Sequence, residues 1–399
     1  MAVLVCFGDY WDDAWRRRQQ LMWRLARSEL LDGVVYVEQP LTLFSFLKFC
    51  FGGGDEDARH RWRRVLRRGF VAKMKPREVY VLTPLTIPLR GSGFLLDLDL
   101  KMRHWAEVYL VRWFLKRYGV KDVLLWVSHP FLPLKTPERL GGNLLCYDCT
   151  EEFSEFAEYP EYARRRFYIA DQSFTRSAKV ATVVSDYLEI SRRRVRQDVI
   201  RIPNGVDIDV FGGDGEGEPA DLRHIPRPRL VSIGGINNSY HWELVERLAQ
   251  TRPEWSLVFI GAVKVEPGLR RRLRRYPSIH FLGRKPYGAL AGYLKHIDVC
   301  LQLYRPTDAN RSRNAQKLLL YLAAGKPVVS TATGDVERLR NHVEVAKTDD
   351  VFIELVEQVL RQDTVAARSG RLEEAERHTW SERVRQVEDA LRPHLQGVR

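Results

Sequence analysis

The chain has 399 residues, 45% of them hydrophobic, and carries a formal net charge of +13. This length predicts two domains, or three, with full hydrophobic cores, and the composition excludes a disordered or fibrous protein. The excess of Lys and Arg favours an anionic partner, which could be nucleic acid, acidic lipid or a phosphorylated small molecule. A solvated basic surface would have the same balance.

The N-terminal run Ala2–Phe7 is apolar, has no basic residue before it and ends close to Asp9. It therefore predicts a buried first strand and not a secretory signal. Since no stretch reaches the length of a membrane span, we expect a cytoplasmic protein. The five cysteines are odd in number and scattered, so they predict no disulfide framework. Cys146 and Cys149 form a C-x-x-C without a second ligand pair, and we predict no metal site.

Short apolar runs then alternate with longer amphipathic ones. Continuous apolar strands separated by helices predict a parallel sheet covered on both faces. In the first half of the chain the expected strands are Ala2–Phe7, Val34–Val37, Val79–Leu82, Val123–Val127, Leu144–Tyr147, Val180–Val184 and Val199–Ile202. The expected helices are Trp15–Arg27, Glu161–Ala178 and Tyr187–Val195.

The alternation stops at Val210–Arg229, which is rich in Gly, Pro and charge and predicts a linker. It then restarts, with expected strands at Leu230–Ile233, Ser256–Ile260, His280–Leu282, Val299–Leu303 and Pro327–Ser330. Expected helices are Trp242–Ala249, Gly268–Arg275, Tyr287–His296, Lys317–Ala324 and, in the tail, Val351–Leu391.

We therefore predict an α/β protein with two Rossmann-like, doubly wound domains that face a cleft. The predicted domains are residues 1–209 and 229–380, with a linker at 210–228. The last helix, within 381–399, could cross back to the first domain. In such sheets ligands bind beyond the carboxyl ends of the strands.

The loop after the strand Leu230–Ile233 contains Gly234 and Gly235, followed by Asn237 and a helix that begins near Tyr240. Glycines let backbone N–H groups approach a phosphate, and a helix N-terminus favours negative charge. The loop is thus a candidate phosphate site. An ordinary turn with Ser239 as N-cap is the alternative.

A second candidate anion site precedes the helix Lys317–Ala324. Arg311, Arg313 and Lys317 lie together there, and a pyrophosphate suits such cations because Arg binds it bidentately and Lys as a point charge. A solvated basic turn would have the same pattern.

His129 and Asp148 follow or end neighbouring expected strands. A histidine and a carboxylate there could orient or deprotonate an acceptor hydroxyl, so both are candidate catalytic residues. A capping histidine and an acidic helix start are the structural alternatives.

Asn204 and Gly205 follow a proline at the end of the first predicted domain. Asn-Gly after proline predicts a tight turn. Just before the linker, this turn could form the floor of the cleft, or it could be a turn and no more.

A basic run extends over residues 59–77, without one acidic residue, and the aromatic-rich run Leu41–Phe51 lies just before it. Together they could bind an anionic membrane surface. Nucleic acid is a second possibility, but no recognised nucleic-acid motif is present, and we expect none as partner. A surface helix with an apolar inner face is the alternative. The basic residues are Arg59, Arg61, Arg63, Arg64, Arg67, Arg68, Lys73, Lys75 and Arg77.

Several motifs together resemble a known family. In the first half they are Trp15-x-Arg17-x-Gln19-Gln20-Leu21, Tyr36-Val37-Glu38-x-Pro40, Tyr147-Asp148-Cys149 and Pro203-Asn204-Gly205-Val206-Asp207. In the second half they are Trp242-Glu243-Leu244, Phe281-Leu282-Gly283 and Lys317 followed by Tyr321-Leu322-Ala323-Ala324-Gly325-Lys326-Pro327-Val328-Val329. On these stretches the chain resembles the GT-B glycosyltransferases of family 4, in the bacterial group that includes teichuronic acid biosynthesis glycosyltransferases.

The resemblance implies transfer of a sugar from a nucleotide diphosphate sugar, with retention and without a metal or other cofactor. It implies that Arg311 and Lys317 hold the pyrophosphate, near the loop of Gly234 and Gly235. One departure concerns the family's glutamate three residues after the lysine, which binds the donor ribose. Leu320 occupies that position here, and Ser312 occupies that of a second common glutamate.

Three functions remain open at this stage. The first is an active, hexosyltransferase-like enzyme that uses a nucleotide-sugar donor and a glycan or lipid-linked acceptor, peripheral on the inner face of the membrane. The second is a degenerate protein of the same fold that binds a glycan or scaffolds another transferase, which Leu320 and Ser312 favour. The third is epimerisation of a nucleotide sugar on the same fold.

Overall fold

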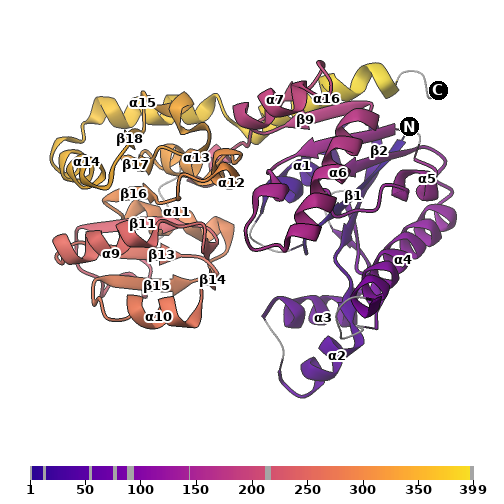
Figure 1. Ribbon diagram of the computed structural model, residues 1–399, viewed down its shortest axis with the longest axis horizontal. Helices are drawn as coiled ribbons and strands as arrows, with labels where there is room; N and C mark the ends of the chain where they lie inside the picture. The colour runs from indigo at the N-terminus through magenta and orange to yellow at the C-terminus, as the bar shows by residue number, and fades with distance from the viewer. Residues whose placement is uncertain are drawn as a thin grey trace. The chain divides into compact units, whose positions relative to one another are not determined.

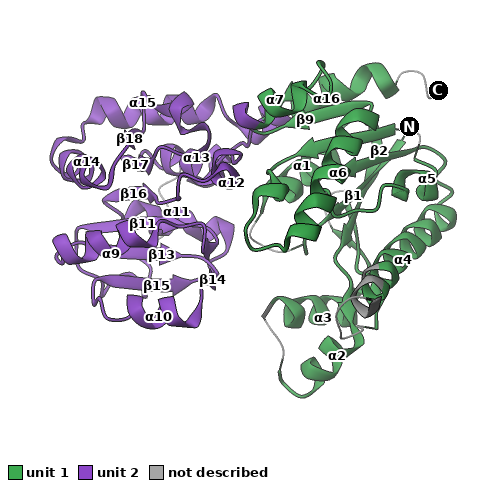
Figure 2. Ribbon diagram, in the orientation of Figure 1, with its two compact units in different colours: residues 1–184, 188–202, 384–399 green, residues 185–187, 203–383 purple. Residues whose placement is uncertain are grey.

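The computed structural model divides the chain into two compact units (Figure 2). Unit 1 comprises residues 1–184, 188–202 and 384–399, and unit 2 comprises residues 185–187 and 203–383. The structure describes residues 2–11, 15–53, 56–74, 79–87, 94–142, 144–211 and 217–395.

Unit 1 is built on an eight-stranded sheet in the order β10-β9-β8-β7-β1-β2-β5-β4 (Figure 1). All neighbours are parallel except β4, which pairs antiparallel with β5 at the edge. Every residue of the central strands β1, β7 and β8 is buried, as expected for a sheet covered on both faces. The strands are β1 (Ala2–Gly8), β2 (Leu31–Glu38), β4 (Val71–Met74), β5 (Val79–Leu82), β7 (Val123–Val127), β8 (Leu144–Cys149), β9 (Val180–Val183) and β10 (Ile200–Arg201).

The helices of unit 1 connect these strands, and a separate two-stranded ribbon joins β3 (Leu41–Thr42) to β6 (Leu85–Thr86). Figure 1 shows α2 and α3 set apart from the main sheet, beside the N-terminal end of α4. The helices are α1 (Arg17–Leu25), α2 (Leu43–Cys50), α3 (Glu56–Arg68), α4 (Phe94–Arg117), α5 (Thr136–Leu140), α6 (Glu161–Ser177) and α7 (Asp186–Arg193), with the short 3-10 turn η1 (Phe153–Glu155).

Unit 2 contains a six-stranded, fully parallel sheet in the order β15-β13-β11-β16-β17-β18. Its strands are β11 (Arg229–Ile233), β13 (Ser256–Ile260), β15 (Ile279–Gly283), β16 (Val299–Gln302), β17 (Val328–Thr331) and β18 (Glu344–Ala346), with the small pair β12 (Ile236–Asn237) and β14 (Val263–Lys264). The helices are α8 (Ile208–Phe211), α9 (Trp242–Thr251), α10 (Pro267–Leu273), α11 (Leu290–Lys295), α12 (Asp308–Arg311), α13 (Gln316–Ala323), α14 (Asp349–Gln362), α15 (Val365–Glu376) and the start of α16 (Trp380–Leu395), with the 3-10 turns η2 (Tyr287–Ala289) and η3 (Gly334–Leu339).

The predicted fold class is confirmed, since each unit is a Rossmann-like domain with a parallel sheet. The strand alternation was readable because buried parallel strands are continuous apolar runs. Helices α2 and α4 were not predicted, and α3 corresponds to the surface helix given as the alternative for the basic run. In α4 apolar and polar residues are distributed around the whole helix, so no one-sided stripe indicates it.

The boundary between the units differs from the predicted one. It lies between Ile202 and Pro203, so the segment after β10 belongs to unit 2. The predicted linker is therefore not a separate segment between the units. Its first residues, Val210 and Phe211, are the last residues of α8, and residues 217–228 also belong to unit 2. Residues 212–216 lie outside the described part of the chain. At the other end, α16 begins in unit 2 and is part of unit 1 from Val384 onward.

Within the described part of the chain, none of the helices combines the length and the apolar character that crossing a bilayer requires.

Candidate functional site

In unit 2 the loop after β11 is a tight, glycine-dependent turn. Gly234 has a φ of +122°, a conformation that residues with a Cβ rarely adopt. Its N–H donates to the carbonyl oxygen of Ile260 over 2.9 Å. The backbone of Gly261 is packed so closely that a Cβ there would lie 1.7 Å from the Gly234 oxygen. The loop therefore offers backbone surface without side chains, while its neighbour Gly235 is exposed.

Lys317 lies directly beside this loop. A Cβ built on Gly234 would be 3.6 Å from the Lys317 Nζ. The ammonium donates to the Tyr240 hydroxyl over 3.1 Å and lies 4.9 Å and 4.5 Å from the ring centroids of Tyr240 and Tyr304. Burial opposes its charge, but the two tyrosines outweigh burial and raise the Lys317 pKa, so the group stays cationic at neutral pH.

Lys317 is also in the first turn of α13, and no side chain of the described residues caps this helix at Ala315. The first N–H groups of a helix lack intrahelical partners and favour an anion. The Tyr321 hydroxyl, in the same helix, accepts from the N–H of Ile233 over 2.8 Å and so ties α13 to the end of β11. A fixed cation, uncapped N–H groups and a glycine loop thus converge on one point.

Asn204 and Gly205 both belong to unit 2, where they hold the segment before α13. The Asn204 N–H donates to the Asn314 Oδ1 over 2.9 Å, and its amide nitrogen donates to the Asn314 carbonyl over 2.6 Å. A Cβ on Gly205 would lie 2.8 Å from the backbone nitrogen of Trp380. Residues 202–205 form no turn, and neither Asn204 nor Gly205 has a left-handed φ, so the predicted tight turn is wrong. The contacts of Asn204 nevertheless position the loop that precedes Lys317.

The other predicted donor residues are engaged in local contacts. Arg311 is exposed and pairs with Asp308 at 3.2 Å, within α12. Arg313, two residues further on, lies 5.5 Å from the ring centroid of Tyr304 and so is closer to the Lys317 cluster. The Asn237 Oδ1 accepts from the N–H of Ser239 over 3.0 Å, which is the geometry of an Asx turn.

The two positions that depart from the family pattern are both buried. Leu320 is 6% exposed, in the middle of α13. Ser312 is fully buried, and its hydroxyl donates to the Ala309 carbonyl over 2.7 Å. A carboxylate at either position would need room and partners that the surrounding residues now fill.

In unit 1 His129 lies with Arg18 and Asp9 at the carboxyl ends of β7 and β1. Burial and the nearby Arg18 guanidinium lower the pKa of His129 to about 3. Arg18 itself lies 3.5 Å from the Asp9 carboxylate. The His129 Nδ1 has no hydrogen-bond partner among the described residues. At neutral pH this imidazole is uncharged, so it can accept a hydrogen bond from a substrate hydroxyl, while its low pKa disfavours uptake of a proton.

Asp148 occupies a different environment from that of His129. It is fully buried in β8, where Arg17 donates to it through Nε (3.0 Å) and Nη2 (2.8 Å). The Thr182 hydroxyl donates to the same carboxylate over 2.8 Å. Since both oxygens are satisfied away from solvent, Asp148 ties α1 to the sheet. These contacts support a structural role better than the predicted role as a base.

Cys146 and Cys149 are free and buried in β8. Three residues apart on a strand, they point to opposite faces of the sheet and cannot bind one ion together. In the described part of the chain, no group of three His, Cys, Asp or Glu side chains is placed to hold a metal ion.

Sequence reasoning missed Tyr240 and Tyr304 beside Lys317, and Asp9 and Arg18 beside His129. Asp9 carried a readable signal, because it directly follows the first strand. Tyr304 likewise comes soon after β16. Tyr240 and Arg18 carried none, since their contacts depend on how separate segments fold together.

Comparisons with known proteins agree with this picture. Residues 239–389 match the family described as glycosyl transferase-like. The putative teichuronic acid biosynthesis glycosyltransferase TuaH of Bacillus subtilis (strain 168) is 26% identical over 258 residues, which are 60% of this chain and 64% of that protein. The chain thus spans less than two thirds of the curated relative.

Solved structures with the same fold cover essentially the whole chain. Sucrose-phosphate synthase from Thermosynechococcus elongatus has a TM-score of 0.71 at 14% identity, with all of both chains covered. Anabaena Alr3699/HepE in complex with UDP-glucose has a TM-score of 0.66 at 12% identity, covering 98% of this chain and 100% of that one. The catalytic domain of starch synthase IV from Arabidopsis thaliana, bound to ADP and acarbose, has a TM-score of 0.69 at 11% identity and 99% coverage of each chain. The resemblance to the GT-B glycosyltransferases is confirmed.

Proposed function

We propose that the protein moves a sugar from a nucleotide diphosphate sugar to a glycan or lipid-linked acceptor. The premise is that residues 239–389 match the glycosyl transferase-like family. The product would be a cell-surface polysaccharide. The transfer would retain the anomeric configuration and would use no metal ion or other cofactor. The enzyme would work at the cytoplasmic face of the membrane as a peripheral protein.

The placement of Lys317 carries this proposal. The Lys317 ammonium is fixed by Tyr240 and Tyr304 between the Gly234 loop and the uncapped start of α13. A donor pyrophosphate bound there would meet a preorganised cation and backbone N–H groups. As the bond to the sugar breaks, negative charge grows on the leaving nucleotide diphosphate, and these groups stabilise it without reorganising.

His129 is the proposed acceptor-side group in unit 1. Because its pKa is lowered to about 3, it is neutral where the enzyme works and can hydrogen-bond a hydroxyl of the acceptor or of the transferred sugar. Asp9 and Arg18, which surround it, would set its orientation and charge. Of the two predicted catalytic residues, His129 is therefore the one we retain.

Titration calorimetry with uridine, guanosine and adenosine diphosphates and their sugars tests the donor site. We expect at least one nucleotide to bind, and Lys317→Ala to weaken it by about 1.5–3 kcal/mol, which is about ten- to a hundredfold. Arg311→Ala should weaken binding less, because Arg311 is exposed and paired with Asp308.

Tyr240→Phe provides a graded variant, since it keeps the ring under Lys317 and removes the hydroxyl contact. Lys347→Ala is the matched control, because Lys347 is an exposed lysine of the same unit. Unchanged affinity in Lys317→Ala, with the control behaving like wild type, would exclude the proposed donor site.

A second candidate function is that of a glycan-binding or scaffolding protein that has lost donor binding. The burial of Leu320 and Ser312 favours it, since both positions are filled by packed, non-acidic residues. The same titrations separate the two candidates: a scaffold of this kind would bind none of the nucleotides or nucleotide sugars, whereas a transferase binds one.

A further inference from the structure

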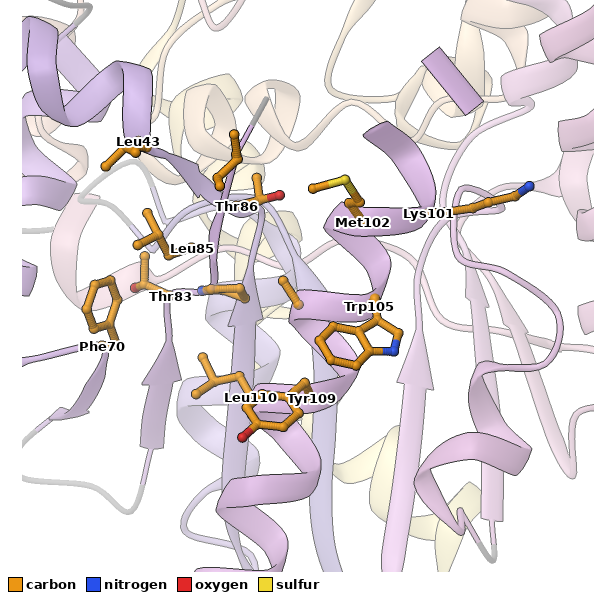
Figure 3. Close-up of a pocket in the computed structure, with 13 residues that line it drawn as sticks. Leu43, Phe70, Thr83, Leu85, Thr86, Lys101, Met102, Trp105, Tyr109 and Leu110 are labelled. Atoms are coloured by element: carbon orange, nitrogen blue, oxygen red, sulfur yellow. The ribbon is translucent and has the colours of Figure 1, made fainter. Parts of the chain in front are cut away.

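Unit 1 contains a pocket of about 780 Å³ that no part of the proposed donor or acceptor chemistry uses. It lies beside the β3–β6 ribbon, between the start of α2 and the middle of α4 (Figure 3). Its walls are made chiefly of apolar side chains, among them Leu43, Phe70, Leu85, Met102, Trp105 and Leu110. A pocket of this size can enclose a drug-sized apolar group.

Large apolar side chains at the pocket are left open to solvent. Trp105 is 65% exposed, Ile87 59% and Leu85 42%. On the same side of unit 1, α2 exposes Leu47 at 51%, and Phe51 just after it at 89%. Monomeric soluble proteins rarely leave large apolar patches uncovered, so the exposed side chains that line the pocket indicate an apolar ligand or surface.

The few polar groups of the lining do not favour a sugar or a nucleotide. The Thr83 hydroxyl already donates to the buried Glu38 over 2.8 Å. Lys101 is exposed, and Figure 3 shows its side chain directed away from the other lining residues. Besides these, the described residues of the lining offer only the polar side-chain atoms of Thr86, Trp105 and Tyr109. Polar ligands need several directed hydrogen bonds to compensate for their desolvation, and a mostly hydrocarbon wall favours an apolar ligand.

Exposed basic residues lie close in sequence to the residues that line the pocket. The lining residue Phe70 follows α3 by two residues, and the last turn of α3 carries the exposed side chains of Arg67 and Arg68. On α2, the Lys48 ammonium lies 4.7 Å from the ring centroid of Phe44. An apolar wall with exposed cations on the adjoining helices α2 and α3 complements an amphiphile that has one hydrocarbon chain and an anionic head.

We propose that this pocket binds one hydrocarbon chain of an anionic lipid that carries the acceptor, with the phosphate of its head near Arg67 and Arg68. This inference rests on the proposed function and names the class of acceptor. The lipid chain would hold the acceptor on unit 1 during transfer.

A homologous series of single-chain alkyl phosphates, from hexyl to hexadecyl and each below its micelle concentration, tests the proposal. Binding is followed by calorimetry and by the change in tryptophan fluorescence, compared with that of a Trp105→Phe variant. We expect affinity to rise by up to about fourfold per buried methylene and then to level off when the pocket is full. An alkyl alcohol of equal length should bind more weakly, because it lacks the charge.

Two variants locate the site. Ala106→Trp places a bulky ring in the pocket and should weaken the best alkyl phosphate by tenfold or more, whereas Ala163→Trp, the same change on α6 away from the pocket, should not. Arg67→Glu with Arg68→Glu should reduce phosphate binding to the level of the alcohol and leave alcohol binding unchanged. Circular dichroism and thermal unfolding show that each variant is folded.

Affinity that does not depend on chain length, or equal binding by the Ala106→Trp and Ala163→Trp proteins, would overturn the proposal. So would concentration-dependent dimerisation that Ala106→Trp abolishes, because a second copy of the chain would then cover the patch. Nucleotide titrations on the same preparations keep the two proposals apart. If the wild-type protein binds a nucleotide but no alkyl phosphate, only the lipid pocket is rejected. If it binds alkyl phosphates but no nucleotide, the transferase is rejected, and the lipid keeps its pocket but loses its role as acceptor.

Discussion

At the scale of single residues, two side chains that look equivalent in sequence have opposite environments. Asp148 is fully buried and paired with Arg17 and Thr182. His129 has an unsatisfied ring nitrogen among the described residues and lies with Asp9 and Arg18. A group whose polar atoms are all satisfied stabilises the fold, and one that keeps an unsatisfied atom can act on a substrate.

We predict that Asp148→Asn lowers the free energy of unfolding by about 3–5 kcal/mol, because it leaves the buried Arg17 guanidinium without its counter-charge. Urea denaturation measures the effect. The double variant Asp148→Leu with Arg17→Met should recover part of the loss, since it removes both charges. If Asp148→Asn were as stable as wild type but inactive, Asp148 would belong to the chemistry after all.

His129 predicts a specific pH dependence of stability. Its pKa falls from 6.5 to about 3 on folding, so below pH 6.5 the unfolded chain takes up a proton that the native protein does not. The free energy of unfolding therefore decreases as the pH falls from 6.5 toward 3. At pH 5 this group alone lowers it by about 2 kcal/mol relative to its value above pH 7. Denaturation at pH 7 and pH 5 should show a smaller pH effect in His129→Gln than in wild type, whereas an equal effect would contradict the assignment.

At the scale of elements, α3 shows how one basic run can serve two purposes. Arg61 and Arg64 face inward, where both pair with the buried Glu38, and the Arg64 Nη1 donates to the Trp11 carbonyl over 2.9 Å. Burial lowers the pKa of Arg61, although Glu38 partly compensates. These two arginines anchor α3 to β2, so the prediction of one continuous membrane-binding run is corrected for them.

The other basic residues of the run can still face a membrane. Arg63, Arg67 and Arg68 are exposed, while Lys75 and Arg77 lie outside the described residues.

We predict that changing Arg63, Arg67 and Arg68 to Glu reduces co-sedimentation with anionic vesicles at low salt and leaves the fold intact. Each exposed cation near such a surface contributes about 1 kcal/mol, and salt screens the attraction. The same charge change at Arg270 and Arg271 on α10 and at Arg274, which directly follows it, is the control, because all three are exposed. Equal recovery with neutral and anionic vesicles would refute an electrostatic contribution.

Arg64→Glu, in contrast, should destabilise the protein, because it places a second carboxylate beside the buried Glu38.

At the scale of the whole molecule, the chain leaves unit 1 at Ile202 and returns to it at Val384. The returning part of α16 buries Val384, Val387 and Leu391, which are 9%, 1% and 1% exposed. Unit 1 is therefore completed only by the end of the chain.

Truncation after Arg383 should destabilise unit 1, because each of the three buried side chains contributes about 1.5–3 kcal/mol. Nucleotide binding by unit 2 should persist. Thermal unfolding, limited proteolysis and nucleotide titration of the truncated protein measure these effects. Truncation after Leu395, which removes only the last four residues, is the control, and equal destabilisation by both truncations would contradict the role of α16.

The sequence by itself determined most strands of the two sheets and the region of the proposed donor site. Buried parallel strands such as Val123–Val127 are continuous apolar runs, and this local property can be read without knowing which strands pair. The glycines after β11 and the cations before α13 were readable for a similar reason, since ligands in such folds bind beyond the strand ends.

Only the tertiary structure decided which of the candidate side chains are satisfied. Arg17 reaches Asp148 across 131 positions of sequence, and Tyr240 reaches Lys317 across 77. The apolar pocket likewise unites α2, the β3–β6 ribbon and α4, which are distant in sequence, and α4 has no one-sided apolar stripe that indicates it. Burial and pairing depend on contacts between distant segments, whereas periodicity and turn residues act over a few neighbours. The sequence could therefore nominate His129, Asp148, Arg311 and Lys317 equally, and the fold separates them.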